Sequence, residues 1–335
     1  MSEPIGLSLI GTGFWGRRLA QAIQRTPSVR LVNCYSRNEA KCSQFAAEFN
    51  CYPAGTLKEA FDHPDVKGVV LATPNNLHAK QTEAAAALGK HVFVEKPIAD
   101  TLEDGLAMQH ACRAAGVSLL VGHSFRRLGA ARKAKDLIRE GILGEIVLAE
   151  ANFSLPGTLT PDKWRYYRES CPGGPLMQLG VHHVDTLQYL LGPITKVRGS
   201  FAKLHTQAEI DDISSTQLIF QNGAMGTLNC SYVSPKTFDL RLYGTEAVLD
   251  YHADMSIWPN ASGMDAATQL RMWNKAGKES IAFDTIDMLE EEFAEFADCI
   301  SGKAQPETDA DQAIQALKIV LAAIESHNLD EWIAL

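Results

Sequence analysis

The sequence lacks both a long apolar run and an excess of positive charge. Its 335 residues carry a formal net charge of -9, with 31 Lys and Arg against 40 Asp and Glu. Nucleic acids and anionic membranes bind basic surfaces, and a membrane-spanning helix needs roughly 18 consecutive apolar residues. Neither nucleic acid nor membrane is therefore expected as a partner, and a small molecule is the expected ligand.

Cysteine is sparse and follows no ligand pattern. The seven cysteines are an odd number, with no Cys-x-x-Cys pair and no His at zinc-like spacing. We therefore expect reduced thiols and no metal site. Residues 1–4 lack the basic region with which a secretory signal begins, so no such signal is expected. These observations favour a cytoplasmic protein.

The order of apolar and amphipathic segments in residues 5–123 predicts a parallel sheet. Short apolar segments alternate there with helical patterns, which is typical of βαβ units. The expected strands are Ile5–Ile10, Val29–Tyr35, Val66–Ala72, His91–Val94 and Val117–Val121. We therefore expect a doubly wound Rossmann domain that binds a dinucleotide at residues 1–124.

Beyond residue 124 the pattern changes to successive strands. Five apolar segments between Ile194 and Tyr251 are separated mostly by short turns, which indicates a largely antiparallel open sheet. The segment Gly263–Lys278 shows no pattern that we can assign. A chain of this length is expected to form two domains. The fold class is therefore α/β, with a substrate-binding and oligomerisation domain at residues 125–335.

A glycine-rich loop follows the first expected strand. It reads Gly11-Thr12-Gly13-Phe14-Trp15-Gly16 and precedes a helical pattern. Glycines at this spacing permit a tight turn and let a pyrophosphate approach the helix N-terminus. The loop therefore predicts dinucleotide binding, and the alternative is an ordinary glycine-rich turn.

The end of the second strand bears on which dinucleotide binds. NAD-binding units usually place Asp or Glu there to hold the ribose hydroxyls, whereas this chain has Ser36 and Arg37. A hydroxyl and a guanidinium can bind a 2′-phosphate, which a carboxylate would repel. NADP is therefore the preferred cofactor. The alternative is that Arg37 is a solvated loop residue and that NAD is used as well.

Polar residues also follow the strands at 66–72 and 91–94. Thr73, Pro74, Asn75 and His78 follow the first of these strands, where they can line the nicotinamide, although His78 is equally compatible with capping a helix. Glu95-Lys96-Pro97 follows the second strand. Ligands bind beyond the carboxyl ends of parallel strands, so Lys96 is a candidate catalytic lysine.

A second candidate group lies on a helix expected to begin at Pro175. Gln178, His182 and Asp185 share one face of this helix, opposite a leucine-rich face. The imidazole of His182 can accept a hydroxyl proton near neutral pH. Asp185, one turn away, can hold a substrate hydroxyl or tune that imidazole. His183 falls on the apolar side and is expected to be a core residue. The alternative for the polar face is an ordinary solvated surface.

Taken together, these residues resemble the glucose-fructose oxidoreductase / inositol dehydrogenase (Gfo/Idh/MocA) family. The resemblance covers nearly the whole chain. Its motifs are Gly11–Gly16, Ala72–Asn75, Glu95–Pro97, Gly122–Arg126, Trp164-Arg165, Gly173-Gly174, Gly180–Asp185 and Arg241–Thr245.

The resemblance implies oxidation of a sugar or polyol hydroxyl and a homo-oligomer, a dimer or tetramer, in which the open sheet often makes the contact. It also implies that Lys96 orients the reacting oxygen and the nicotinamide, that the Lys96–Pro97 bond can be cis, and that Trp164 and Arg165 reach toward the cofactor. Enzymes similar to inositol dehydrogenase carry Asp four residues before the active-site His. Here that position is Gln178, which can orient a hydroxyl but cannot stabilise an imidazolium by charge.

The sequence thus predicts an NADP-preferring dehydrogenase acting on a sugar, a sugar derivative or a cyclic polyol. Hydride would pass between a substrate carbon and the nicotinamide, with Lys96 and His182 as the catalytic pair across a cleft between the domains. Use of NAD and reduction of a keto or unsaturated compound remain open within the enzyme class. The alternative outside it is a non-catalytic dinucleotide sensor, because fold alone does not fix function.

Overall fold

The computed structural model describes residues 3–255 and 263–335, so residues 1 and 2 of the amino-terminal segment considered above lie outside it. The chain forms two compact units, Met1–His123 with Leu289–Ile314, and Ser124–Met288 with Gln315–Leu335. The first unit therefore includes a segment from late in the chain. The expected division into residues 1–124 and 125–335 does not include this late segment in the first domain. That division stays a prediction.

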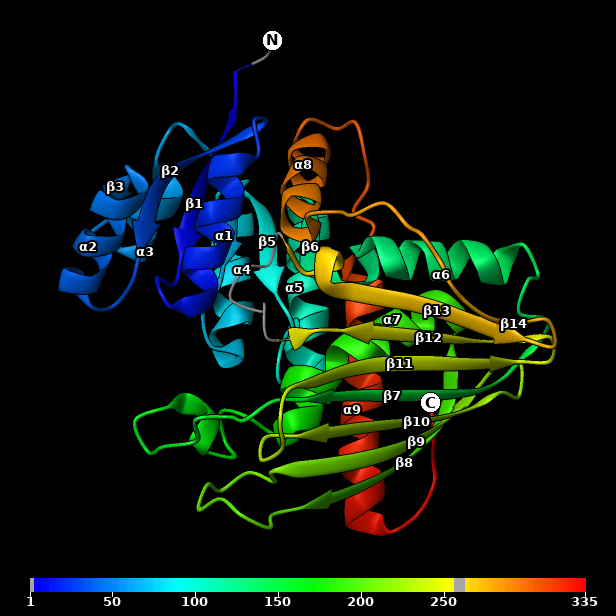
Figure 1. Cartoon of the computed structure of the whole chain (residues 1–335). Helices are drawn as coiled ribbons and strands as arrows, with labels where there is room; N and C mark the ends of the chain where they lie inside the picture. Colours follow the sequence, from blue (N-terminus) through cyan, green and yellow to red (C-terminus); the bar gives the residue numbers. More distant parts are fainter. Residues whose placement is uncertain (1–2, 256–262) are drawn as a thin grey trace. The chain divides into compact units, whose positions relative to one another are not determined.

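The first unit contains a parallel sheet. Among the described residues, its order is β3-β2-β1-β4-β5-β6 (Figure 1). The bounds are β1 Ile5–Ile10, β2 Val29–Tyr35, β3 Tyr52–Pro53, β4 Val66–Leu71, β5 His91–Glu95 and β6 Leu119–Gly122. The strand order reverses between β1 and β4, and ligands of such sheets bind beyond the carboxyl ends of the strands at this reversal. The expected doubly wound Rossmann sheet is therefore confirmed.

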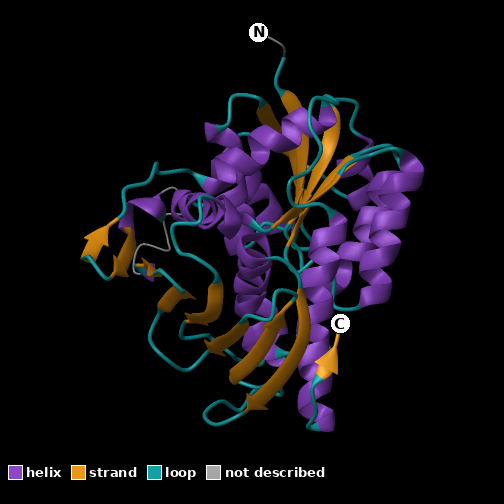
Figure 2. Ribbon diagram, turned by 90° about the vertical axis from the view of Figure 1, so that its right-hand side faces the viewer, coloured by secondary structure: helices purple, strands orange, loops and turns teal. Residues whose placement is uncertain are grey.

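Helices pack on both sides of this sheet (Figure 2). They are α1 Phe14–Arg25, α2 Glu39–Phe49, α3 Leu57–Asp62, α4 His78–Ala87, α5 Leu102–Ala115 and α8 Met288–Ile300. The late segment joins the core through aromatic contacts, since the Phe93 ring of β5 lies 5.1 Å from that of Phe293 and 6.0 Å from that of Phe296. Gly68 of β4 leaves room for α8, because a Cβ there would meet the Phe296 ring at 2.9 Å.

The second unit contains a larger, mostly antiparallel sheet. Within the described part of the chain its order is β14-β13-β12-β11-β7-β10-β9-β8-β15, and only the β7–β10 pair is parallel. The bounds are β7 Ile146–Ser154, β8 Ile194–Ala202, β9 Ile213–Phe220, β10 Met225–Ser231, β11 Thr237–Gly244, β12 Ala247–Ala253, β13 Thr268–Asn274, β14 Gly277–Ser280 and β15 Ile333–Ala334. The unassigned segment 263–278 supplies β13 and the start of β14.

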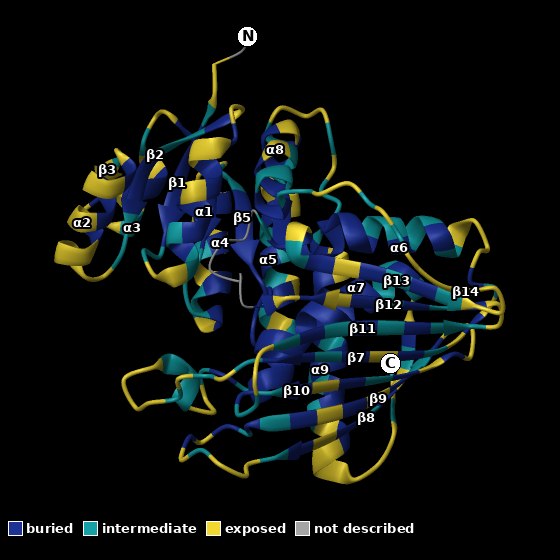
Figure 3. Cartoon of the chain, viewed as in Figure 1, coloured by how far each residue is buried: buried dark blue, intermediate teal, exposed yellow. Residues whose placement is uncertain are grey.

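Helices cover one face of the second sheet. These are α6 Gly129–Arg139, α7 Val181–Leu191 and most of α9 Ala310–Leu329. Helix α9 approaches β8 so closely that a Cβ on Gly199 would lie 2.1 Å from the Ala323 carbonyl oxygen. Only glycine fits at this position of β8. Buried and more exposed residues alternate along β9 and β10 (Figure 3). This alternation is typical of a sheet with one packed and one open face.

Candidate functional site

The glycine loop at the end of β1 leaves space where a dinucleotide would lie. Gly11 adopts φ +100°, and a Cβ on Gly16 would meet the Gly11 carbonyl oxygen at 1.9 Å. A Cβ on Gly13 would meet nothing within 4 Å, so this side of the turn is open. Gly13 caps α1, whose first turn contains no acidic residue. The loop thus presents the uncovered N–H groups of a helix N-terminus, which suits a pyrophosphate. A dinucleotide fits the residues present here.

The segment proposed to distinguish NADP from NAD is tied to the glycine loop. The Gly11 N–H donates to the Tyr35 carbonyl at 2.9 Å, so the end of β2 is fixed beside the turn. Ser36 donates to the Asn38 carbonyl at 3.1 Å. Arg37 is exposed and forms no ion pair with any described residue. Its guanidinium is therefore available to an anionic ligand.

His78 connects the turn after β4 to the turn after β5. The ring is fully buried, with Nε2 3.0 Å from the Thr73 carbonyl oxygen and Nδ1 3.1 Å from that of Ile98 and 3.2 Å from that of Pro97. Burial lowers the pKa of His78. Because both nitrogens face backbone carbonyls, the ring braces the two turns in this structure. Its expected contact with the cofactor stays a prediction.

Asn75 makes a second connection between the same two turns. Its Nδ2 donates to Oδ1 of Asp100 at 3.0 Å, and both side chains are buried. Burial raises the pKa of Asp100 to about 6, and its Oδ2 finds no hydrogen-bond partner among the described residues. Thr73 donates to Oε1 of Gln81 at 2.7 Å. Side chains from the turn after β4 thus hold the segment that directly follows Lys96.

Lys96 lies at the carboxyl end of β5, directly after the last residue of the strand. Glu95 and Lys96 are 7% and 8% exposed, so both charged groups are largely removed from water. Burial raises the pKa of Glu95 to about 7, although the Lys96 ammonium opposes this rise. The Lys96–Pro97 peptide bond is cis. The structure therefore places a desolvated ammonium on the ligand-binding edge of the sheet.

The expected polar face of the second unit's helix is buried. Gln178, His182 and Asp185 are 4%, 2% and 1% exposed, so the alternative of a solvated surface is wrong. Gln178 lies in a π-helical turn, Leu176–Gly180, that leads into α7. The His182 ring packs edge-on against Phe125, with 4.2 Å between ring centroids.

Asp185 is bound by Arg126, a residue for which no individual role is expected from the sequence. Its two carboxylate oxygens accept from Nε and Nη2 of Arg126, with 2.8 Å between Nε and Oδ2. The pair is almost fully buried. Such a bidentate pair holds the carboxylate in one orientation. Asp185 is therefore engaged by a guanidinium in this structure, and its contact with a substrate hydroxyl stays a prediction. Arg126 is the last residue of the Gly122–Arg126 motif, and its membership of that motif is the sequence signal that could have identified it.

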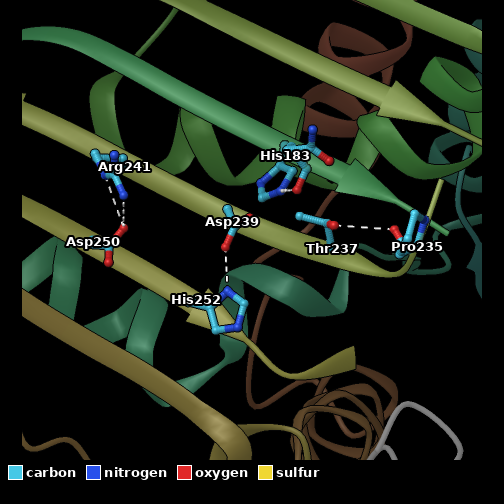
Figure 4. Close-up of polar contacts among 8 residues, drawn as sticks. His183, Pro235, Thr237, Asp239, Arg241, Asp250 and His252 are labelled. Atoms are coloured by element: carbon cyan, nitrogen blue, oxygen red, sulfur yellow. Dashed lines mark hydrogen bonds and ion pairs between the residues drawn. The ribbon is translucent and has the colours of Figure 1, made fainter. Parts of the chain in front are cut away.

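His183 is the core residue that the sequence predicts. Its Nε2 lies 3.2 Å from the Asn152 carbonyl oxygen (Figure 4). Its ring stacks on that of Phe238 with centroids 4.4 Å apart. Burial lowers its pKa to about 4, so the ring is neutral near pH 7. Of the two neighbouring histidines, only His182 lies on the side of Gln178 and Asp185.

Trp164 and Arg165 form a short 3-10 turn, Trp164–Tyr166, in the loop before this helix. The Arg165 guanidinium lies 4.5 Å from the Trp164 ring centroid, and its Nε donates to Oε1 of Gln178 at 3.4 Å. This long hydrogen bond links the loop to the buried polar face. Their reach toward a cofactor stays a prediction.

Residues 3–255 and 263–335 contain neither a metal-ligand cluster nor a membrane-spanning helix. No cluster of three or more His, Cys, Asp or Glu side chains with the geometry of a metal site occurs in these residues. Nor does any helix in them combine the length and apolarity needed to cross a bilayer.

Comparison with known proteins gives a consistent assignment. Residues 5–123 match the oxidoreductase family with an NAD-binding Rossmann fold, and residues 131–250 match the GFO/IDH/MocA C-terminal domain. The solved structure of a Desulfitobacterium hafniense protein, described as an NADPH-dependent oxidoreductase, has a TM-score of 0.96 and is 35% identical. That match covers 100% of this chain and 98% of the other.

Two curated relatives match over nearly their whole length. The 1,5-anhydro-D-fructose reductase of Ensifer adhaerens is 28% identical over 324 residues, 95% of each chain. The NADP(+) D-xylose 1-dehydrogenase of Haloarcula marismortui is 26% identical over 350 residues, covering 99% of this chain and 94% of the other. The chain therefore belongs to the Gfo/Idh/MocA family of NAD(P)-dependent oxidoreductases.

Proposed function

We propose that the protein is an NADP-preferring dehydrogenase that acts on a sugar, a sugar derivative or a cyclic polyol. The observation that carries this proposal is the desolvated Lys96 ammonium at the carboxyl end of β5, on the edge of the sheet where the glycine loop also lies. The two curated relatives named above act on an anhydro-sugar and on xylose, which supports the substrate class.

Lys96 and His182 are the proposed catalytic residues. The cofactor supplies the hydride acceptor at the nicotinamide ring when it is bound. An ammonium hydrogen-bonded to the reacting oxygen stabilises negative charge on it, which is the role proposed for Lys96. His182 is proposed to accept the hydroxyl proton during oxidation and to return it during reduction. Its surroundings of Phe125 and Phe153 exclude water from the ring.

The remaining polar residues on this helix are proposed to orient the substrate. Gln178 offers an amide to a substrate hydroxyl, while Arg165 donates to its Oε1. Asp185 is proposed to act mainly through Arg126, since both carboxylate oxygens bind that guanidinium. The absence of an acid at position 178 leaves the imidazolium of His182 without a charged neighbour at that place. This difference means either that the substrate differs from that of inositol dehydrogenase or that Asp185 takes part of the role.

The NADP preference is proposed from Ser36 and Arg37. The exposed Arg37 guanidinium and the Ser36 hydroxyl lie at the end of β2, where an NAD-selective enzyme usually has a carboxylate. Glu95, Thr73, Pro74 and Asn75 are proposed to border the nicotinamide side of the same edge.

We also propose that the protein is a cytoplasmic homo-oligomer. None of the seven cysteines, all of which lie in the described residues, forms a disulfide, which suits a reducing compartment. The open face of the second sheet has a hollow of about 560 Å³ lined by acidic and basic side chains. Asp239 pairs with His252, and Arg241 pairs with Asp250 across β11 and β12 (Figure 4). A surface with both signs of charge can be complementary to a second copy of itself across a two-fold axis.

The test of the proposed function is nicotinamide reduction across a panel of sugars, sugar acids, polyols and cyclic polyols, with NADP and NAD in parallel. The expected result is turnover with at least one carbohydrate and higher kcat/KM with NADP. Tight NADP binding without redox change on any panel member, in either direction, would instead favour a dinucleotide sensor.

A further inference from the structure

Helix α1 carries a buried positive charge next to the glycine loop. Arg18 lies just beyond the first turn of this helix and is 8% exposed. Its neighbour Arg17, in contrast, is partly exposed and pairs with Glu48 of α2. No hydrogen bond or ion pair joins Arg18 to any residue that the structure describes, and its Nε is a buried donor without an acceptor among them. Because a buried charge without an anionic partner is destabilising, Arg18 is a candidate for binding an anionic ligand.

The side chain of Arg18 extends back toward the N-terminus of α1. Its guanidinium carbon lies 4.6 Å from the ring centroid of Phe14, the first residue of the helix, and 5.9 Å from that of Trp15. The two rings meet edge to face, with 6.0 Å between their centroids. Side chains on a helix lean toward its N-terminus, and a cation is attracted to an aromatic face. The guanidinium therefore lies beside the first turn of α1.

Two sources of positive potential thus coincide at the glycine loop. The first turn of α1 presents N–H groups with a partial positive charge and contains no acidic residue. Arg18 adds a full positive charge to the same turn. Burial lowers the pKa of Arg18, but a guanidinium keeps its proton in proteins. These like charges repel each other, and an anion that contacts both would relieve the repulsion.

We propose that Arg18 binds the diphosphate of the dinucleotide, as a charged contact in addition to the backbone N–H groups of the glycine loop. The chemistry recognised is that of a phosphoryl oxyanion, to which a guanidinium can donate two parallel hydrogen bonds. Phe14 and Trp15 position the guanidinium for this contact. The contact is common to NADP and NAD, unlike that proposed for Arg37, which serves the 2′-phosphate alone.

An acidic substrate, such as a sugar acid or a sugar phosphate, is a second source of an oxyanion. The placement of Arg18 favours the cofactor, because its guanidinium packs on the first residue of the helix whose N–H groups suit a pyrophosphate. The inference rests on dinucleotide binding at this loop. It does not depend on turnover or on the preference for NADP.

The test is a binding titration of the full-length protein with NADPH, NADH and ADP, which needs no substrate. Arg18→Met removes the charge and keeps an unbranched apolar stem against the two rings. The expected result is a loss of about tenfold in affinity for all three ligands, the equivalent of one hydrogen bond to a charged group. Arg17→Met is the matched control and should leave these affinities nearly unchanged, because an exposed ion pair contributes little.

Thermal unfolding gives a second readout. Without ligand, Arg18→Met should unfold at a temperature no lower than wild type, because an apolar side chain replaces a buried charge without a partner. NADPH should then raise the melting temperature of wild type more than that of the variant. A purely structural role for Arg18 would instead lower the melting temperature of the ligand-free variant and leave its affinity for ADP unchanged.

Arg18→Lys keeps the charge but offers no pair of parallel donors, so it should lose a few-fold in affinity for ADP. This variant keeps the proposal testable if Arg18→Met does not fold. An unchanged affinity for ADP in either variant would overturn the proposal. A loss confined to NADPH would assign the guanidinium to the 2′-phosphate and would also overturn it.

Two outcomes separate this proposal from its neighbours. Unchanged cofactor binding in Arg18→Met, with a raised KM for an acidic sugar, would assign the guanidinium to the substrate and contradict the proposal. A wild-type protein that binds neither NADPH nor NADH would overturn it together with dinucleotide binding at the loop. If wild type binds the cofactors but turns over no sugar, the proposed dehydrogenase activity fails, while the comparison of ADP affinities still decides the role of Arg18.

Discussion

At the scale of single residues, Lys96 and its neighbours show how local order and distant contacts combine. Strand β5 brings Glu95 and Lys96 to the ligand-binding edge, which the sequence pattern predicts. The contacts that brace the following turn come from His78 and Asn75, roughly twenty positions earlier in the chain. No periodicity or spacing rule reports such contacts, because they depend on how adjacent strands align.

The pairing of Asp185 with Arg126 could not be predicted from the sequence for the same reason. The helical spacing correctly groups it with Gln178 and His182, but its partner Arg126 is 59 residues away. A buried carboxylate requires a partner, and burial itself was not predictable for this face. His183, in contrast, was identified as a core residue because its place on the apolar side of the helix is a local property.

Arg37 tests the cofactor preference at this scale. Arg37→Glu should weaken NADP binding by at least about tenfold, because the new carboxylate repels a 2′-phosphate that the guanidinium would pair with. NAD binding should change much less. Fluorescence titration with NADPH and NADH measures both affinities. The control is Lys41→Glu, the same charge reversal at an exposed residue of α2. Equal loss for the two cofactors would contradict the role of Arg37.

Asp100 predicts a pH dependence of stability. Its folded-state pKa is raised to about 6 by burial, so the folded protein binds a proton that the unfolded chain releases near pH 4. Its contribution is therefore fully present below pH 4 and is lost as pH rises through 6. Asp100→Asn, which keeps an acceptor for Asn75, should gain about 3 kcal/mol over wild type between pH 4 and pH 7.

Urea unfolding at a series of pH values measures this difference. Asp136→Asn on α6, where the carboxylate is exposed and pairs with Arg139, is the control for loss of one negative charge. A constant difference between Asp100→Asn and wild type across the range would show that the buried carboxyl does not titrate between pH 4 and pH 6.

At the scale of elements, the sequence predicts most strands and helices but not their exact form. The helix expected from Pro175 begins as the π-helical turn Leu176–Gly180, which a spacing of 100° per residue does not represent. The hairpin β13–β14 lay in the segment that showed no pattern, and β14 is exposed along its whole length. An exposed strand need not alternate apolar and polar residues, so periodicity carries no signal there.

The loop between β8 and β9 is held by one buried carboxylate. Asp212 accepts from the N–H groups of Leu204, His205 and Thr206 at 2.8 to 2.9 Å. Burial alone would raise the pKa of Asp212, but these donors outweigh it and lower the pKa. The stabilisation is therefore present above about pH 4, the unfolded value, and is lost as pH falls through the lower folded pKa.

Asp212→Asn should lower the free energy of unfolding by about 2 kcal/mol at pH 7, because a neutral amide accepts more weakly and brings an unneeded donor. Urea unfolding measures the loss, and hydrogen exchange of the three amides should accelerate. Asp211→Asn is the neighbouring control, since Asp211 pairs with the exposed Arg168 and such pairs contribute little. Equal effects of the two substitutions would contradict the account of this loop.

At the scale of the whole molecule, the sequence predicts the two sheet types but not the return of the chain. Segment Leu289–Ile314 belongs to the first unit, although it follows the second sheet in sequence. The reason lies in Phe293 and Phe296, which pack on Phe93. An amphipathic helix shows that it needs a core, but not which of two cores it joins.

The open face of the second sheet gives the prediction on assembly. We expect a dimer or tetramer by light scattering, and Asn229→Arg should shift it to a smaller species, because a bulky charge is added at an exposed position of β10 beside the polar hollow. Gln24→Arg, on the exposed side of α1, is the control and should leave the mass unchanged. A monomeric wild type, or an unaltered mass for Asn229→Arg, would show that this face is not the subunit contact.

The central claim is that the buried Lys96 ammonium acts on the reacting oxygen of a carbohydrate. Its most direct test is a comparison of Lys96→Met with wild type in single-turnover nicotinamide reduction, with NADP affinity measured on the same samples. The account predicts that the rate falls by at least about a hundredfold, as for loss of one group that stabilises the transition state, while the NADP Kd changes only a few-fold. An unchanged rate with a good substrate, or a loss fully explained by weaker NADP binding, would contradict it.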